Sequence, residues 1–206
     1  MIKSKKLSRL KDLKHGFFNS IGGQSKNIYK SLNCGLGSKD KKSDIKKNLQ
    51  IVRKNISKKA KNIFLLHQFH SNKFIYIDEK YQNKKKPKAD AIITNQKLLP
   101  IAVLTADCAP ILIYDNKIKM IAAIHAGWRG AYKDIVKRVI KFMIKKGCLQ
   151  KNITAAIGPC IASNNYEVKK DFIKKFIKKD KKNILFFKKI KNKIYFSLNK
   201  YIYFQL

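Results

Sequence analysis

The strongest restriction on the fold comes from two apolar runs separated by a short polar turn. The runs are PILIY (110–114) and IKMIAAI (118–124), and the turn-forming residues 115–117 (Asp-Asn-Lys) lie between them. This pattern predicts a β-hairpin in which the numbers of paired residues sum to about 232 or 233. Cys108 and His125 would then lie opposite, or nearly opposite, each other at the open end of the hairpin, with Cβ atoms about 5 Å apart.

Further short apolar runs flank the hairpin and predict additional strands, because each is rich in branched and aromatic residues. Apolar residues at helical spacing predict helices near 43–57, 130–146 and 168–178, and the last segment, 193–206, is typical of a strand that enters a helix. Hairpins in the middle of the chain, without regular βαβ units, indicate an α+β fold. At 206 residues the chain fits a single domain, 1–206. The flanking strand candidates are NIFLLHQFH (62–70), KFIYID (73–78), DAIIT (90–94), IAVLTAD (101–107) and TAAIGPC (154–160).

The net charge of +36 first suggests a polyanionic partner. However, only four of the 48 basic residues are arginine, the residue preferred for bidentate recognition of bases and phosphates. The lysines are also spread along the whole chain and interleaved with Asn and Ile. We therefore expect a solvated lysine surface that binds nucleic acid weakly at low salt, rather than a specific nucleic-acid footprint.

The sequence gives no sign of export or membrane insertion. The N-terminal segment is positively charged but has no apolar h-region. No stretch approaches the roughly 20 apolar residues that span a bilayer. The four cysteines do not resemble a disulfide framework, so we expect a protein of the reducing cytoplasm without a membrane partner.

Histidine and cysteine side chains near the hairpin suggest a metal site. His67 and His70 end a predicted strand, and residues three apart point to opposite faces of a strand, so at most one of them joins Cys108 and His125. Two His and one Cys would leave a zinc ion an open fourth position, which is the catalytic pattern. Two alternatives remain at this point: Cys108 could be a nucleophile with His125 as its base, or both could be structural core residues.

Other polar residues near these positions are weaker candidates. Asp107 could act as an acid or base, but as the strand neighbour of Cys108 it is expected to face away from a metal. Arg129 could contact a substrate or support its loop. We expect Cys160 in the IGPC turn to be a packed thiol. His15, His67, Cys34 and Cys148 are also interpreted as structural.

The central segment TADCAPILIYDNKIKMIAAIHAGWRGAYKDIV closely resembles the signature of the polyphenol-oxidase-like "laccase domain" family, also described as bacterial purine nucleoside phosphorylases and as relatives of a peptidoglycan editing factor. The pieces HGFFNSIGGQSKNIYKSLNCGLGSKD, HQFHS, ADAIITNQ and IGPCIASNNYEV occur in the family's order, from about Lys14 to the last residue. TADC and HAGWRG at this separation are specific motifs.

The resemblance implies a zinc enzyme whose ligands match His70, Cys108 and His125. It implies phosphorolysis of adenosine, inosine, guanosine and methylthioadenosine, and deamination of adenosine. It also implies a four-layer mixed fold of sheets and helices related to toxin-type cysteine hydrolases. Two other functions compete: a copper-dependent polyphenol oxidase, which needs more His than the four present, and a metal-free Cys–His hydrolase or amidase acting on peptidoglycan precursors.

This chain departs from the family pattern at three places. Ser20 stands where the family usually has Arg after HGFFT, and Leu49 stands where Arg usually follows Asn48. The family's usual C-terminal segment, with its arginines, is also expected to be missing. These departures remove three expected sources of anion-binding arginine, and nearby lysines would have to substitute as point charges.

Overall fold

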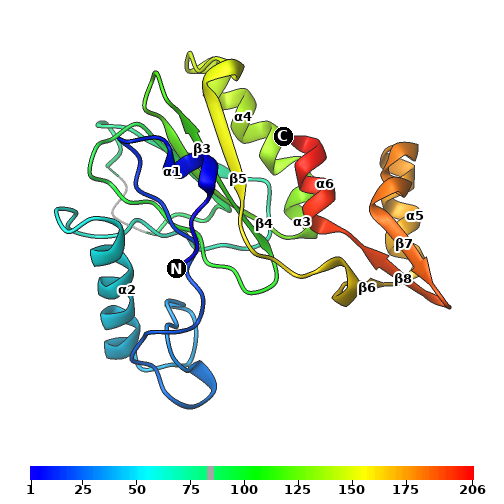
Figure 1. Cartoon of the computed structure of the whole chain (residues 1–206), viewed down its shortest axis with the longest axis horizontal. Helices are drawn as coiled ribbons and strands as arrows, with labels where there is room; N and C mark the ends of the chain where they lie inside the picture. The colour runs from blue at the N-terminus through cyan, green and yellow to red at the C-terminus, as the bar shows by residue number, and fades with distance from the viewer. Residues whose placement is uncertain (83–85) are drawn as a thin grey trace.

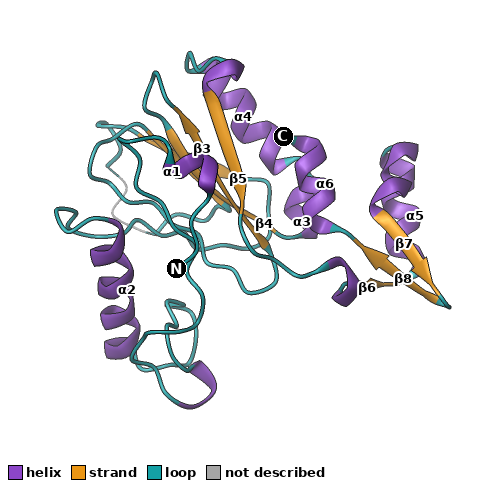
Figure 2. Ribbon diagram, viewed as in Figure 1, coloured by secondary structure: helices purple, strands orange, loops and turns teal. Residues whose placement is uncertain are grey.

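The computed structural model describes residues 1–82 and 86–206, and a mixed five-stranded sheet lies at its centre (Figures 1 and 2). The strand order is β1-β2-β4-β3-β5, with β1 and β2 parallel and the other neighbours antiparallel. Helices and a second, smaller sheet accompany it, so the fold is α+β, as predicted. The strands are β1 (Phe74–Ile77), β2 (Ala91–Thr94), β3 (Ala109–Asp115), β4 (Ile121–Ala126) and β5 (Ile153–Ile157).

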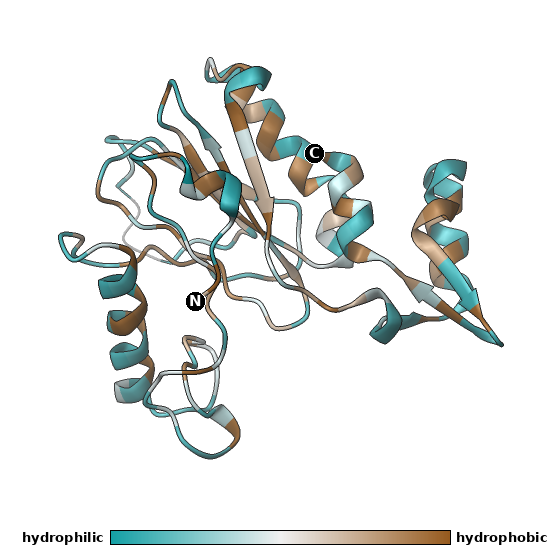
Figure 3. Ribbon diagram, viewed as in Figure 1, coloured by the Kyte–Doolittle hydropathy of each residue, from teal (hydrophilic) through white to brown (hydrophobic). Residues whose placement is uncertain are grey.

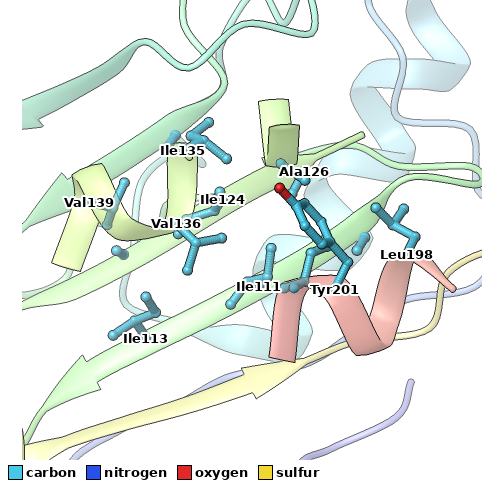
Figure 4. Close-up of a cluster of buried hydrophobic side chains, with 14 of the residues drawn as sticks. Ile111, Ile113, Ile124, Ala126, Ile135, Val136, Val139, Leu198 and Tyr201 are labelled. Carbon is cyan, nitrogen blue, oxygen red and sulfur yellow. The ribbon is translucent and has the colours of Figure 1, made fainter. Parts of the chain in front are cut away.

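Helix α4 (Ile135–Lys145) and helix α6 (Leu198–Gln205) cover one face of this sheet (Figure 1). The apolar residues of α4 recur at helical spacing, so one side of the helix can be buried while its lysines stay in solvent. Figure 4 shows Val136 and Val139 of α4 and Tyr201 of α6 gathered over Ile111 and Ile124 of the sheet. The predicted strand-to-helix ending of the chain is confirmed by β8 (Lys193–Phe196) and α6.

The second sheet has the order β6-β8-β7 and forms a lobe with helix α5 at the right of Figure 1. An aromatic cluster joins this lobe to the central body: Phe172 packs edge-on against Trp128, and Phe176 against Tyr132. Figure 3 shows apolar and polar residues alternating along α5, as expected of a helix with one packed face. The elements are β6 (Glu167–Val168), α5 (Lys170–Lys179), η4 (Lys181–Phe186) and β7 (Phe187–Ile190).

The predicted hairpin forms as β3 and β4, but the numbers of its paired residues sum to 235 rather than 232 or 233. Pro110, not Cys108, pairs with His125, because the loop is residues 116–119 rather than the predicted 115–117. The Asp115 backbone amide donates to the carbonyl of Met120 at 2.9 Å, and the Asp115 carboxylate accepts from two amides inside the loop. Lys119 adopts a left-handed conformation with φ 62°, which completes the turn.

Two predicted strands, 62–70 and 101–107, are wrong, since each makes only isolated bridges. In these two segments, hydrogen bonds from side chains take the place of a β-ladder. The Gln68 amide bonds both the backbone N–H and the carbonyl of Leu104, each at 2.8 Å. Two amides of the first segment, Phe64 and His67, donate to the carbonyls of Pro100 and Pro87, and proline has no backbone N–H with which to continue a ladder.

The helix predicted near 130–146 is instead two helices, α3 (Trp128–Tyr132) and α4. Asp134 between them has φ 60°, a left-handed conformation that interrupts a right-handed helix. The helices predicted near 43–57 and 168–178 are confirmed as α2 (Lys42–Ile56) and α5. In the part of the chain that the structure describes, no helix combines the length and the apolar character needed to cross a bilayer.

Asn48 of α2 holds the N-terminal loops in place. Its side chain is fully buried and donates to Ser25 Oγ and to the carbonyls of Ser31 and Asn33, while its oxygen accepts from the Gln24 amide at 2.7 Å. The amide therefore replaces secondary structure in a segment with little of its own.

We expect Asn48→Ala to lower the free energy of unfolding by about 3 kcal/mol, because it leaves several buried backbone groups without partners. Urea unfolding followed by circular dichroism measures this change. Asn55→Ala is the matched control on the same helix, since Asn55 is exposed and bonds only to the carbonyl of Ile51. Equal effects of the two substitutions would contradict the assigned role.

Candidate metal centre

His125 lies near the end of β4, and its side chain is 4% exposed. Antiparallel pairing with Pro110 on one side and β2 on the other fixes its backbone. Its N–H also donates to the carbonyl of Asp90 at 2.8 Å. The imidazole is therefore held on a rigid element rather than on a loop.

Cys108 lies in a bend immediately before β3, and its thiol is partly exposed. Its Sγ lies within 4.8 Å of a ring nitrogen of His125, although the two residues are diagonal rather than direct neighbours across the hairpin. The predicted proximity of Cys108 and His125 is thus confirmed despite the shifted register, because diagonal cross-strand neighbours are still within reach.

His70, rather than His67, joins these two residues. One donor atom from each of His70, Cys108 and His125 lies within 4.8 Å of the other two. The rings of His70 and His125 are edge-to-face, with centroids 4.9 Å apart. His70 has φ 61°, an uncommon conformation for a residue other than glycine, so the local loop must hold it there.

Asp90 holds the loop of His70 in this conformation, and it was not among the residues predicted from the sequence. Its fully buried carboxylate accepts from the backbone amides of Phe69, His70 and Ser71 and from Ser71 Oγ, at 2.6 to 3.4 Å. The same carboxylate is 2.9 Å from Nδ1 of His125. The one available signal was an acidic residue at the start of an otherwise apolar strand, in ADAIIT.

These contacts set the electrostatics of the centre. Burial alone would raise the pKa of Asp90, but hydrogen bonds from His125 and Ser71 outweigh it and lower that pKa. Burial alone would lower the pKa of His125, yet its bonds to Asp90 and Cys108 raise it to about 9. With Nδ1 facing Asp90, Nε2 of His125 is left to face the other donors.

Gly127 allows the donor side chains to converge. A Cβ at this position would lie 2.7 Å from Cys108 Sγ and 3.0 Å from a ring carbon of His70. Both distances are shorter than normal contacts, so any larger residue would displace one of the donors. The glycine of the HAGWRG motif therefore has a steric role in the site.

A cavity of about 300 Å³ is lined by two of the three donors, His70 and Cys108. Asp107 lines it together with Cys108, which corrects the expectation that Asp107 faces away: residues 106–108 form a bend, so strand alternation does not apply. Arg129 also lines the cavity and is exposed, with its guanidinium 5.4 Å from the ring centroid of Trp128. The remaining lining residues are apolar or aromatic: Trp128, Ile161, Tyr166 and Leu198.

Two further residues near the centre are Tyr166, on the cavity wall, and Cys160. Burial, with the charges of Cys108 and Asp107, raises the pKa of Tyr166 to about 12, so its hydroxyl stays protonated and can donate. Cys160 is partly buried and packs against the core. Outside the centre, His15 accepts from the Ser4 amide at 3.0 Å and Cys148 is buried, in accord with the structural roles expected for them.

The donor set suits a borderline-soft metal ion. Two imidazoles and one thiolate are ligands that zinc and copper both accept, whereas calcium and magnesium prefer oxygen. The Asp90 contact to Nδ1 of His125 is the carboxylate–histidine arrangement that commonly orients metal-binding imidazoles. The residues present therefore fit a single metal ion with an open side toward the cavity.

Curated relatives share much of this sequence. A purine nucleoside phosphorylase of Rickettsia prowazekii is 41% identical over 129 residues, which cover 63% of this chain and 52% of that protein. A purine nucleoside phosphorylase of Bacteroides thetaiotaomicron is 30% identical over 186 residues, which cover 86% of this chain and 69% of that protein. The matched part thus spans about half the length of the Rickettsia relatives.

Solved structures of related proteins have a similar fold. A Neisseria meningitidis protein described as DUF152 superposes with a TM-score of 0.78 at 28% identity, covering 89% of this chain and 73% of that one. The YfiH protein of Bacillus licheniformis superposes with a TM-score of 0.81 at 25% identity, covering 90% and 73%. The family described as multi-copper polyphenol oxidoreductase laccase matches residues 14–206. The chain therefore belongs to this laccase-like family.

Proposed function

We propose that this protein is a zinc-dependent purine nucleoside phosphorylase that also deaminates adenosine. The observation that carries the proposal is the convergence of His70, Cys108 and His125 at a cavity with aromatic walls. The name borne by the relatives in Rickettsia and Bacteroides supports the reaction class. Adenosine, inosine, guanosine and methylthioadenosine are the proposed substrates, with phosphate as the second reactant.

The three donors would hold the metal, and the chain's other residues would orient them. A bound zinc ion lowers the pKa of a coordinated water and polarises substrate oxygens. Asp90 keeps His125 in the tautomer whose Nε2 can be a ligand, and it anchors the amides around His70. Gly127 leaves the space in which the thiolate and the imidazoles approach one another.

The cavity wall can bind a flat purine ring. Trp128 and Tyr166 provide aromatic surface and Ile161 an apolar contact, all beside Cys108. Asp107 lies on the same wall and is exposed, so it can accept or deliver a proton at the purine as the glycosidic bond breaks. The protonated hydroxyl of Tyr166 is a hydrogen-bond donor to the same substrate.

Cations beside Trp128 can attract phosphate. Arg129 lines the cavity, and Lys175 Nζ lies 5.2 Å from the centroid of the Trp128 ring. One arginine can bind a phosphate bidentately, while a lysine adds a point charge. These two residues are the proposed substitutes for the arginines that the family has at the positions of Ser20 and Leu49.

One further arrangement favours a second candidate function, a metal-free cysteine hydrolase. Cys108 Sγ lies within 4.8 Å of His125, and Nδ1 of His125 is 2.9 Å from Asp90, which is the order of nucleophile, base and orienting carboxylate in a catalytic triad. The relation to toxin-type cysteine hydrolases that the family resemblance implies would suit this chemistry. A copper oxidase is disfavoured, because the chain has four histidines and the described residues hold one cluster of three donors.

We expect purified protein to contain about one zinc ion per chain, and Cys108→Ala to lose nearly all of it, since a thiolate ligand is removed. Elemental analysis by plasma mass spectrometry measures both. Cys148→Ser is the matched control, because that thiol is buried away from the centre. Protein that binds no zinc, yet alkylates at Cys108 faster than at its other thiols, would support the hydrolase instead.

Asp90→Asn should weaken zinc affinity by about 10–100-fold, because the amide no longer fixes the tautomer and orientation of His125. Competition with a chromophoric chelator gives the affinity, and circular dichroism shows whether the variant is folded. Ser71→Ala removes one hydroxyl donor from Asp90 but leaves its contact to His125, so a smaller effect is expected. A folded Asp90→Asn variant with unchanged affinity would show that Asp90 does not position the ligand.

Incubation with adenosine should release adenine and ribose 1-phosphate only when phosphate is present, and inosine should form without phosphate. Liquid chromatography separates the four compounds. Arg129→Ala should raise the KM for phosphate while leaving inosine formation nearly unchanged, because only one reaction uses the anion. An unchanged KM for phosphate in Arg129→Ala would show that Arg129 does not bind the phosphate.

A further inference from the structure

The pairing of β3 with β5 continues beyond the end of β5 into the IGPC turn. The Gly158 amide donates to the carbonyl of Pro110 at 2.8 Å, which extends the antiparallel register by one residue. Farther along, the Ile161 amide donates to the carbonyl of Asp107 at 2.9 Å. These two backbone hydrogen bonds therefore enclose a short segment, to which each of the two antiparallel stretches contributes two residues.

Cys108 and Cys160 occupy matched positions inside this segment. The bonded pairs on both sides have the same register as the pair Cys108–Cys160. Residues 106–108 form a bend, so strand alternation does not set the direction of the Cys108 side chain, but the two hydrogen bonds hold the two backbones side by side. Opposed residues of antiparallel strands have Cα atoms about 4.5–5.5 Å apart, and disulfides span Cα separations of about 4.4–6.8 Å, so the backbone places these two cysteines in the range that a disulfide requires.

The two thiols differ in how easily a small reagent can reach them. Cys108 lines the cavity, so a small reagent can reach it, whereas Cys160 is packed against the core. Cys108 is thus suited to react first and Cys160 to resolve the product.

We propose that Cys108 and Cys160 form a reversible disulfide when the centre holds no metal and a hydroperoxide is present. The Cys108 thiolate attacks the terminal oxygen of the hydroperoxide and becomes a sulfenic acid, and the O–O bond breaks to give an alcohol, or water from hydrogen peroxide. The Cys160 thiol then attacks the sulfenic sulfur, and water leaves. Two thiols are oxidised by two electrons and one peroxide is reduced.

The disulfide would control metal loading. Cys108 Sγ belongs to the cluster of three donors, and a sulfur in a disulfide is no longer a thiolate ligand. Metal binding and disulfide formation are therefore mutually exclusive. This consequence rests on the proposed metal site, whereas formation of the disulfide itself depends only on the positions of the two cysteines.

Full-length protein, stripped of metal with a chelator and fully reduced, is treated with an equimolar amount of hydrogen peroxide, trapped with N-ethylmaleimide and digested. Mass spectrometry is expected to find a peptide pair linked through Cys108 and Cys160, which disappears after dithiothreitol. Cys34 and Cys148 are internal controls and should remain alkylated. Zinc added before peroxide should reduce the yield of the linked peptide at least tenfold.

Cys160→Ser separates the possible outcomes. In this variant Cys108 is expected to stop at sulfenic or sulfinic acid, while zinc binding is retained, since Cys160 is outside the donor cluster. Wild-type protein in which Cys108 overoxidises without a link to Cys160, or links to Cys34 instead, would overturn the proposal. A linked peptide whose yield zinc does not change would leave the disulfide standing and contradict the proposed metal site.

Discussion

The geometry of the centre depends on one buried carboxylate, that of Asp90. It has no exposed surface, and a carboxylate in such a place is stable only when its lone pairs are satisfied. Three consecutive backbone amides, a serine hydroxyl and an imidazole supply the donors. Because the amides belong to the loop of His70 and the imidazole to His125, a single charge aligns two of the three donor side chains.

The positions of the central strands could be predicted from sequence because their apolar runs are bounded by clear turn residues. The register could not, since it depends on the number of residues that the loop contains. At Asp115 the side chain bonds to two loop amides while the backbone still pairs with Met120, and this lengthens the loop to four residues. Cys108 and His125 were nevertheless correctly placed together, because diagonal neighbours across a hairpin are still within reach of each other.

The two segments that were wrongly predicted as strands show why the rest of the site could not be predicted from the sequence. The run 62–70 is as apolar as a strand, but the Asp90 side chain accepts from two of its amides, and its Gln68 side chain bonds to the backbone of Leu104. A hydrogen bond between distant side chains and backbone leaves no periodic pattern in the sequence. The choice of His70 over His67 therefore came from resemblance to a family, and Asp90 was not found by either route.

The scarcity of arginine determines how an anion could be held beside this centre. Of 48 basic residues four are arginine, and among the residues that line the described cavity Arg129 is the one that can form a fork with phosphate. Its guanidinium and the Lys175 ammonium both lie about 5 Å from the Trp128 ring, which Phe172 of the second lobe supports. An aromatic ring attracts cations to its faces, so Trp128 keeps two positive groups near the cavity in spite of their mutual repulsion. The lobe that carries Lys175 and Phe172 is thus tied to the proposed anion-binding side of the site, since it supplies a charge and also the packing that holds the ring in place.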